Sequence, residues 1–168
     1  MDWSFIFTAG NLVYVGVLSA AALRWGAAPE RVCVATLFLM TFGDAAYHAA
    51  LAQGPVYGTV DIGHLLIDIG VAVAFIGVAL WANRVYPLWL AAFQLVSVIS
   101  HFAREVTGSF PKLAYGLMTY VPYYVVLLIM AGGLWRHAIR TKRYGPYRSW
   151  RPFSNPSPGV MRTSPPSG

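Results

Sequence analysis

Aspartate and histidine recur at helical spacing in this 168-residue sequence. Asp44 precedes His48 by four residues, His64 precedes Asp68 by four, and His101 follows in a third stretch. Residues three or four apart lie on one face of an α-helix, so each pair is expected to share a face. Imidazole and carboxylate groups together suit metal ligation, proton transfer or hydrogen bonding.

Three chemical uses of these side chains stay open. In the first, a transition metal binds to His48, His64, His101, Asp44 and Asp68, and a carboxylate one turn from a histidine acts as ligand or as orienting group. In the second, the three histidines are cofactor ligands, holding a haem or a chlorophyll-type pigment through an axial imidazole. The third is a hydrogen-bonded network that fixes helix register. The sequence identifies neither the cofactor nor a catalytic residue.

Apolar stretches must position these side chains. Hydrophobic residues make up 57% of the chain and charged residues 11%, against roughly 45–50% and about 25% in soluble domains. Five stretches approach the length that spans a bilayer, at residues 4–23, 32–52, 60–82, 87–103 and 113–135. They predict an all-α fold, a polytopic membrane helix bundle with about five transmembrane helices. In that topology the three histidines lie at similar depths, in the half of the membrane farther from the carboxyl terminus.

The distribution of basic residues predicts the orientation. Ten of the twelve Lys and Arg residues would share one side of the membrane, namely Arg24, Arg31, Arg84 and the seven cations from Arg136 onward. The positive-inside rule then places the amino terminus outside and the carboxyl terminus in the cytoplasm, in a bacterial inner membrane. A basic cluster directly after a helix is typical of contact with anionic lipid, so we expect the bilayer as a partner and no nucleic acid.

The carboxyl-terminal part of the chain differs in composition from the rest. We predict a five-helix bundle at residues 1–143 and a proline-rich, aromatic and basic cytoplasmic tail at residues 144–168. Too few aliphatic residues follow position 144 for that segment to pack a core alone. Two states of this segment stay open: disorder on the inner membrane surface, and docking on a partner through three aromatic residues, Tyr147, Trp150 and Phe153.

Glycines recur every seven residues in the third stretch, at Gly63, Gly70 and Gly77. Small residues in a membrane helix let a neighbouring backbone approach closely. We therefore expect a close-packed face on this helix.

Residues 82–101, Ala-Asn-Arg-Val-Tyr-Pro-Leu-Trp-Leu-Ala-Ala-Phe-Gln-Leu-Val-Ser-Val-Ile-Ser-His, resemble short, uncharacterised polytopic membrane proteins of alphaproteobacteria. The resemblance implies a bacterial multi-pass protein and no particular activity. We predict a small accessory or assembly subunit of a larger inner-membrane complex, respiratory or photosynthetic, whose partners are other membrane subunits or a second copy of the chain. Two alternatives stay open: a metal- or haem-dependent membrane enzyme acting on a lipid or quinone, and a membrane sensor that binds a ligand through aromatic residues of the fifth helix.

Overall fold

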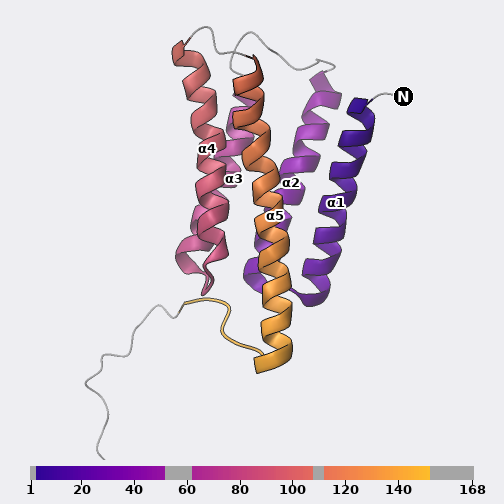
Figure 1. The fold of residues 1–168 in the computed structure, drawn as a ribbon, viewed down its shortest axis with the longest axis vertical. Coiled ribbons are helices and arrows are strands. Elements are labelled where there is room, and N and C mark those ends of the chain that lie inside the picture. The colour runs from indigo at the N-terminus through magenta and orange to yellow at the C-terminus, as the bar shows by residue number, and fades with distance from the viewer. Residues whose placement is uncertain (1–2, 52–61, 108–111, 152–168) are drawn as a thin grey trace, which may run out of the picture.

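The chain forms five α-helices in the computed structural model, which describes residues 3–51, 62–107 and 112–151 (Figure 1). They are α1 (Trp3–Trp25), α2 (Ala28–Leu51), α3 (Ile62–Trp81), α4 (Tyr86–Thr107) and α5 (Lys112–Tyr144). Within these ranges no strand forms, apart from an isolated antiparallel bridge between Ala82 and Trp150. The predicted all-α class is confirmed. The fifth helix runs to Tyr144, well beyond the end of the predicted bilayer span at residue 135.

Local chemistry explains where α2 begins and where α5 ends. At the start of α2, the Oε2 atom of Glu30 accepts a hydrogen bond from the Ala27 backbone N–H at 3.1 Å, which satisfies a donor that the helix itself leaves open. At the end of α5, Gly145 adopts a φ of 79° and its N–H donates to the Thr141 carbonyl at 3.0 Å. Pro146 follows and cannot continue the helix.

The helices form a closed bundle. Each helix packs on the next in sequence, and α5 also packs on α1 and α2. Figure 1 shows the five helices running roughly along one axis, with the connections α1–α2 and α3–α4 at the same end as the carboxyl end of α5. The core is built from aliphatic and aromatic side chains of all five helices, including Val15, Leu37, Phe75, Leu90 and Met130.

Two glycines mark places where helices approach closely. A Cβ atom at Gly133 of α5 would lie 2.7 Å from the ring of Tyr86 on α4, whereas one at the adjacent Gly132 would meet no atom within 4 Å. On α3, Gly63 packs directly against the Tyr47 ring of α2. A Cβ at Gly70 would meet no atom within 4 Å. Among the described residues, no other helix therefore packs closely against this part of the predicted close-packed face.

Two of the described helices are long and apolar enough to cross a membrane, Ile62–Trp81 and Tyr86–Ala103. Core helices of soluble proteins have similar composition, but they are mostly buried. Here only 33% and 39% of the two spans is buried inside the bundle. On α3, for example, Leu66, Val73 and Leu80 are each more than 60% exposed. These helices therefore turn much of their apolar surface outward.

Candidate functional site

Asp68 of α3 lies at the centre of a buried polar group between α3 and α4. Its Oδ2 atom accepts a hydrogen bond from Nε2 of His101 at 3.0 Å, and its Oδ1 atom accepts one from the Gln94 amide at 2.9 Å. All three residues are at most 6% exposed. Each carboxylate oxygen therefore has a partner, as a buried carboxyl group requires.

A second carboxylate–imidazole pair joins α2 to α3. Oδ1 of Asp44 lies 2.7 Å from Nε2 of His64. The ring of Tyr47 meets the His64 ring edge-on, with the ring centres 5.3 Å apart. In contrast to the Asp68 pair, these side chains are 28% (His64) and 44% (Asp44) exposed. The pair can therefore be reached from outside the bundle.

Polar contacts at the same end continue to α1 and α5. The Tyr123 hydroxyl of α5 donates to Oδ1 of Asn11 on α1 at 2.8 Å. Thr41 of α2 lies 3.2 Å from the same hydroxyl and donates to it, because the tyrosine has a single hydrogen to give. Thr41 is one turn before Asp44 on α2. Polar side chains from all five helices thus occupy this half of the bundle, which we call the outer polar site: Asn11, Thr41, Asp44, His64, Asp68, Gln94, His101 and Tyr123.

The structure divides four of the five sequence-predicted site residues into two pairs. Asp44 is with His64, and Asp68 is with His101. His48 lies on α2, but its side chain is outside the described residues. Among the residues that the structure describes, no three His, Cys, Asp or Glu side chains converge as a metal site would require. Binding of a metal, haem or pigment stays a prediction. In each pair a carboxylate holds one ring nitrogen of the imidazole and fixes the orientation of the ring, so each pair is suited to orient a ligand.

The sequence analysis missed a second buried polar group, at the opposite end of the bundle. Glu30 of α2 and Arg84 of the α3–α4 connection form an ion pair, with Oε1 and Nε 3.0 Å apart. Their side chains are 0% and 6% exposed. Nη2 of Arg84 also lies 3.5 Å from Nδ1 of His137 on α5. Because a guanidinium only donates, that histidine nitrogen accepts, and the His137 ring is neutral with its proton on Nε2.

The segment after α5 returns to the bundle and closes over this group. The Asn83 N–H donates to the Ser149 carbonyl at 3.0 Å, and the Arg151 N–H donates to the Trp81 carbonyl at 2.8 Å. Nη1 of Arg84 donates to the Arg148 carbonyl at 3.2 Å. We call residues 145–151 the return segment. In Figure 1 it leaves the lower end of α5 and passes beneath the bundle.

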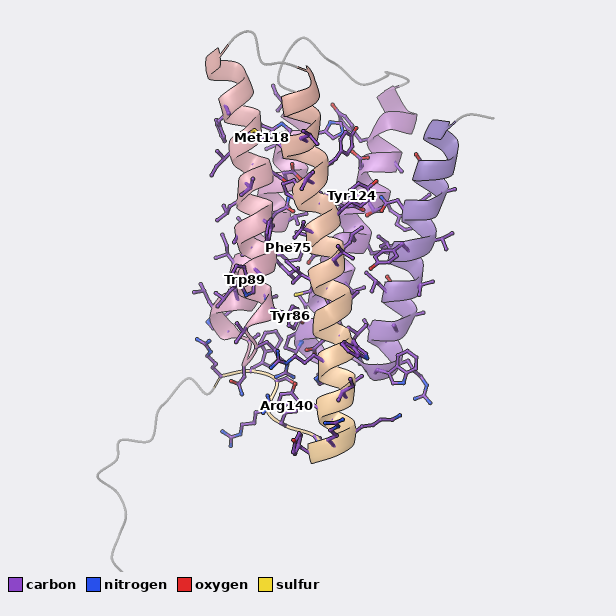
Figure 2. All side chains as sticks on the ribbon, in the orientation of Figure 1. Phe75, Tyr86, Trp89, Met118, Tyr124 and Arg140 are labelled. Atoms are coloured by element: carbon purple, nitrogen blue, oxygen red, sulfur yellow. The ribbon has the colours of Figure 1, made fainter. Side chains whose placement is uncertain are left out.

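Tyr147 fixes the return segment to α5. Its hydroxyl donates to Nδ1 of His137 at 3.0 Å, and its ring lies between the guanidinium groups of Arg84 and Arg140, at 4.1 and 4.2 Å from the ring centre. In Figure 2, Arg140 projects from the last turns of α5 at this end of the bundle. Trp150 is 38% exposed, and Phe153 lies outside the described residues. Docking of Tyr147, Trp150 and Phe153 on a partner stays a prediction.

Burial lowers the pKa of His137 below its ordinary value. The carboxylate of Glu30 opposes this shift and the charge of Arg84 adds to it. The lowered pKa agrees with the acceptor role of Nδ1. At neutral pH the group is therefore an Arg–Glu ion pair beside a neutral imidazole.

One signal in the sequence could have revealed this second group. The predicted topology already placed the start of the second helix, the third connection and the end of the fifth helix on one side. Glu30, Arg84 and His137 are the ionisable residues at those three points that the structure buries together. By contrast, the charge distribution along the sequence indicates only which side of the membrane Arg84 occupies and gives no partner for it.

Comparisons of the chain with protein families, with curated proteins and with solved structures return no match. The site is therefore interpreted from its own geometry.

Proposed function

We propose that the chain is a five-span integral membrane protein, with its amino terminus outside and its carboxyl terminus in the cytoplasm. Two spans of suitable length and outward-facing apolar side chains support this placement. The end that carries Arg24, Arg31, Arg84 and the four cations of the last turns of α5, Arg136, Arg140, Lys142 and Arg143, is then the cytoplasmic end. The outer polar site lies in the opposite half of the membrane.

The same proposal assigns the protein to a larger bacterial inner-membrane complex, respiratory or photosynthetic, as a small accessory or assembly subunit. The observation that carries it is the outer polar site itself, two carboxylate–imidazole pairs within a bundle whose outside is largely apolar. Ionisable groups in a bilayer cost about 2.5–3.5 kcal/mol each on insertion scales. Hydrogen bonds between membrane helices return only about 0.6 kcal/mol on average. Structural stability alone is therefore a poor reason to keep them, and binding of a cofactor, ion or partner group is a better one.

An exposed helix face supports membership of a complex. Gly70 of α3 has open space where a side chain would be, between the exposed side chains of Leu66 and Val73. Within the membrane, small residues let a second helix pack closely on such a face. We assign this face to a neighbouring subunit.

Topology is tested by labelling single cysteines from either side of the membrane. Cys33 is the chain's only native cysteine, so Asp2→Cys and Lys142→Cys are introduced separately into a Cys33→Ala background. Alanine is chosen because Cys33 is buried. We expect a membrane-impermeant maleimide to label residue 2 from outside and residue 142 only in inverted vesicles. Release of the protein by alkaline carbonate, or labelling of both positions from one side, would contradict the five-span arrangement.

Membership of a complex is tested by purification from the native membrane in mild detergent, followed by mass spectrometry. We expect other membrane chains in fixed stoichiometry, and their loss in Gly70→Leu. The matched control is Gly132→Leu, because Gly132 also has open space around it. A protein that migrates alone, or only with copies of itself, contradicts the proposal.

The ligand of the outer polar site is tested on the same native preparation. An absorption spectrum detects haem or pigment, and elemental analysis detects a metal. Any bound group should be lost in His64→Ala, because the Asp44–His64 pair is the more exposed of the two. If the native complex contains none of these groups, the role of the site reduces to holding a proton or a partner side chain.

A further inference from the structure

The last turns of α5 form a basic groove. Arg136, Arg140 and Arg143 stand four and three residues apart and share one helix face with Ile139 and Tyr144. These five residues line an open groove of about 570 Å³. No carboxylate lines it. Among the described residues, the acidic side chain placed at this end of the bundle is Glu30, which is buried against Arg84.

Contacts with the return segment hold one wall of the groove in place. The Arg140 guanidinium stacks on the Tyr147 ring, whose hydroxyl is hydrogen-bonded to His137. A π contact orients a guanidinium without neutralising its charge. Part of the entropy that Arg140 would lose on binding a ligand is therefore already lost in the free protein.

The groove lies at the level where lipid headgroups are expected. It begins at Arg136, one residue after the proposed span 113–135, and rises about 1.5 Å per residue from there. The headgroup layer on each side of the hydrocarbon core is roughly 5–7 Å thick, so Arg136 falls within it and Arg140 lies at its outer edge. Trp135 is 70% exposed at the end of the proposed span, as is usual for an aromatic residue at the membrane interface.

We propose that this groove binds the phosphate of an anionic phospholipid in the cytoplasmic leaflet. The inference rests on the membrane placement proposed above and adds a ligand class at a different site. Arginine suits this ligand because its planar guanidinium binds two phosphate oxygens at once. Ile139, which lies between Arg136 and Arg140 in the sequence, supplies apolar contact for the glycerol region, which a free phosphate ion would not use.

The full-length protein in mild detergent tests the proposal by native mass spectrometry. Phosphatidylglycerol and phosphatidylcholine are added in turn, and the number of retained lipids is compared between Arg136→Gln/Arg143→Gln and a control, Lys142→Gln/Arg148→Gln. The control removes two charges from the same end of the chain without touching the groove lining. Arg140 is left intact, because it also supports the return segment.

We expect wild type and control to retain phosphatidylglycerol in preference to phosphatidylcholine. An exposed ion pair contributes up to about 1 kcal/mol, so loss of two arginine–phosphate contacts should weaken the binding of phosphatidylglycerol to the groove variant by up to about 30-fold. Equal losses in both double variants, or no preference between the two lipids in wild type, would overturn the proposal. So would competition by millimolar inorganic phosphate, which would indicate a site for free phosphate.

Failure of this inference is distinguishable from failure of the membrane placement. If the protein resists carbonate extraction but shows no lipid preference, only the proposal of lipid binding by the groove is contradicted. If carbonate releases the protein, both the membrane placement and the lipid-binding proposal are contradicted. Circular dichroism of each variant checks that the helices are intact. Because both double variants lose two positive charges from the same end of the chain, a difference in lipid binding between them is specific to the groove.

Discussion

Removing the Glu30 carboxylate should destabilise the bundle far more than removing an exposed charge. Its side chain is 0% exposed and its partner Arg84 is 6% exposed. Breaking one side of a buried ion pair costs about 3–5 kcal/mol, because the remaining charge stays buried without compensation. An exposed pair contributes about 0–1 kcal/mol. Glu30→Ala also loses the hydrogen bond to the Ala27 N–H, which adds about 1 kcal/mol.

Two further variants separate these contributions. Glu30→Gln keeps an oxygen for the Ala27 N–H but loses the charge, so it should be less destabilised than Glu30→Ala by about 1 kcal/mol. Glu30→Met/Arg84→Met removes both charges. Its destabilisation should therefore be smaller than the sum of the two single methionine variants, since the sum counts two uncompensated charges.

Denaturant unfolding in detergent, followed by circular dichroism, measures these free energies. Arg24→Gln is the control, because Arg24 is exposed at the same end of the bundle. A cost below about 1 kcal/mol for Glu30→Ala, equal to that of the control, would refute the reasoning. So would strict additivity of the two methionine substitutions.

Three other substitutions test separate parts of the structure. Gly133→Ala should cost about 1–3 kcal/mol by forcing two helices apart, whereas Gly132→Ala should be neutral or slightly stabilising, and thermal unfolding in detergent compares them. Asp68→Ala should cost about 2–4 kcal/mol, because it removes the partner of the buried His101 ring and leaves the Gln94 amide only the residue 68 carbonyl at 3.4 Å, whereas Asp44→Ala should cost about 1 kcal/mol or less. Equal costs would contradict the difference in burial. The pKa of His137 is lowered in the folded state, so as the pH falls below about 6.5 the unfolded state gains a proton and the folded state does not. The free energy of unfolding should therefore decrease by at most about 1.4 kcal/mol per pH unit in this range. His137→Gln should flatten this pH dependence, and an unchanged slope in that variant would assign the pH dependence to another group.

The sequence predicted the helices well because their signals are local. Apolar stretches of suitable length, with glycine and proline between them, locate all five helices within a few residues, except at the end of α5. That helix continues because residues 136–144 contain strong helix formers and no proline, and the helix stops where Gly145 and Pro146 stop it. The predicted span ended at residue 135 because it followed hydrophobicity, which falls where the charged residues begin although the helix continues.

The sequence could not predict which polar residues pair with each other, for a different reason. Spacing placed Asp44, His64, Asp68 and His101 on suitable helix faces, but it could not determine which carboxylate meets which imidazole. That choice depends on the rotation and vertical offset of α2, α3 and α4, which are fixed by packing across the whole bundle. The Glu30–Arg84 contact is harder still to predict, because its partners are 54 residues apart and neither lies in an apolar periodic pattern.

The position of the return segment bears on how the protein is made. Arg84 leaves the ribosome before α5 and can meet Glu30, which is already made, but Tyr147 and the Arg148 carbonyl become available only after the whole of α5 has been synthesised. A chain cut short at Tyr144 would therefore contain all five described helices and still leave that guanidinium only partly enclosed. Such a fragment should be degraded faster by a protease than a chain that includes the return segment.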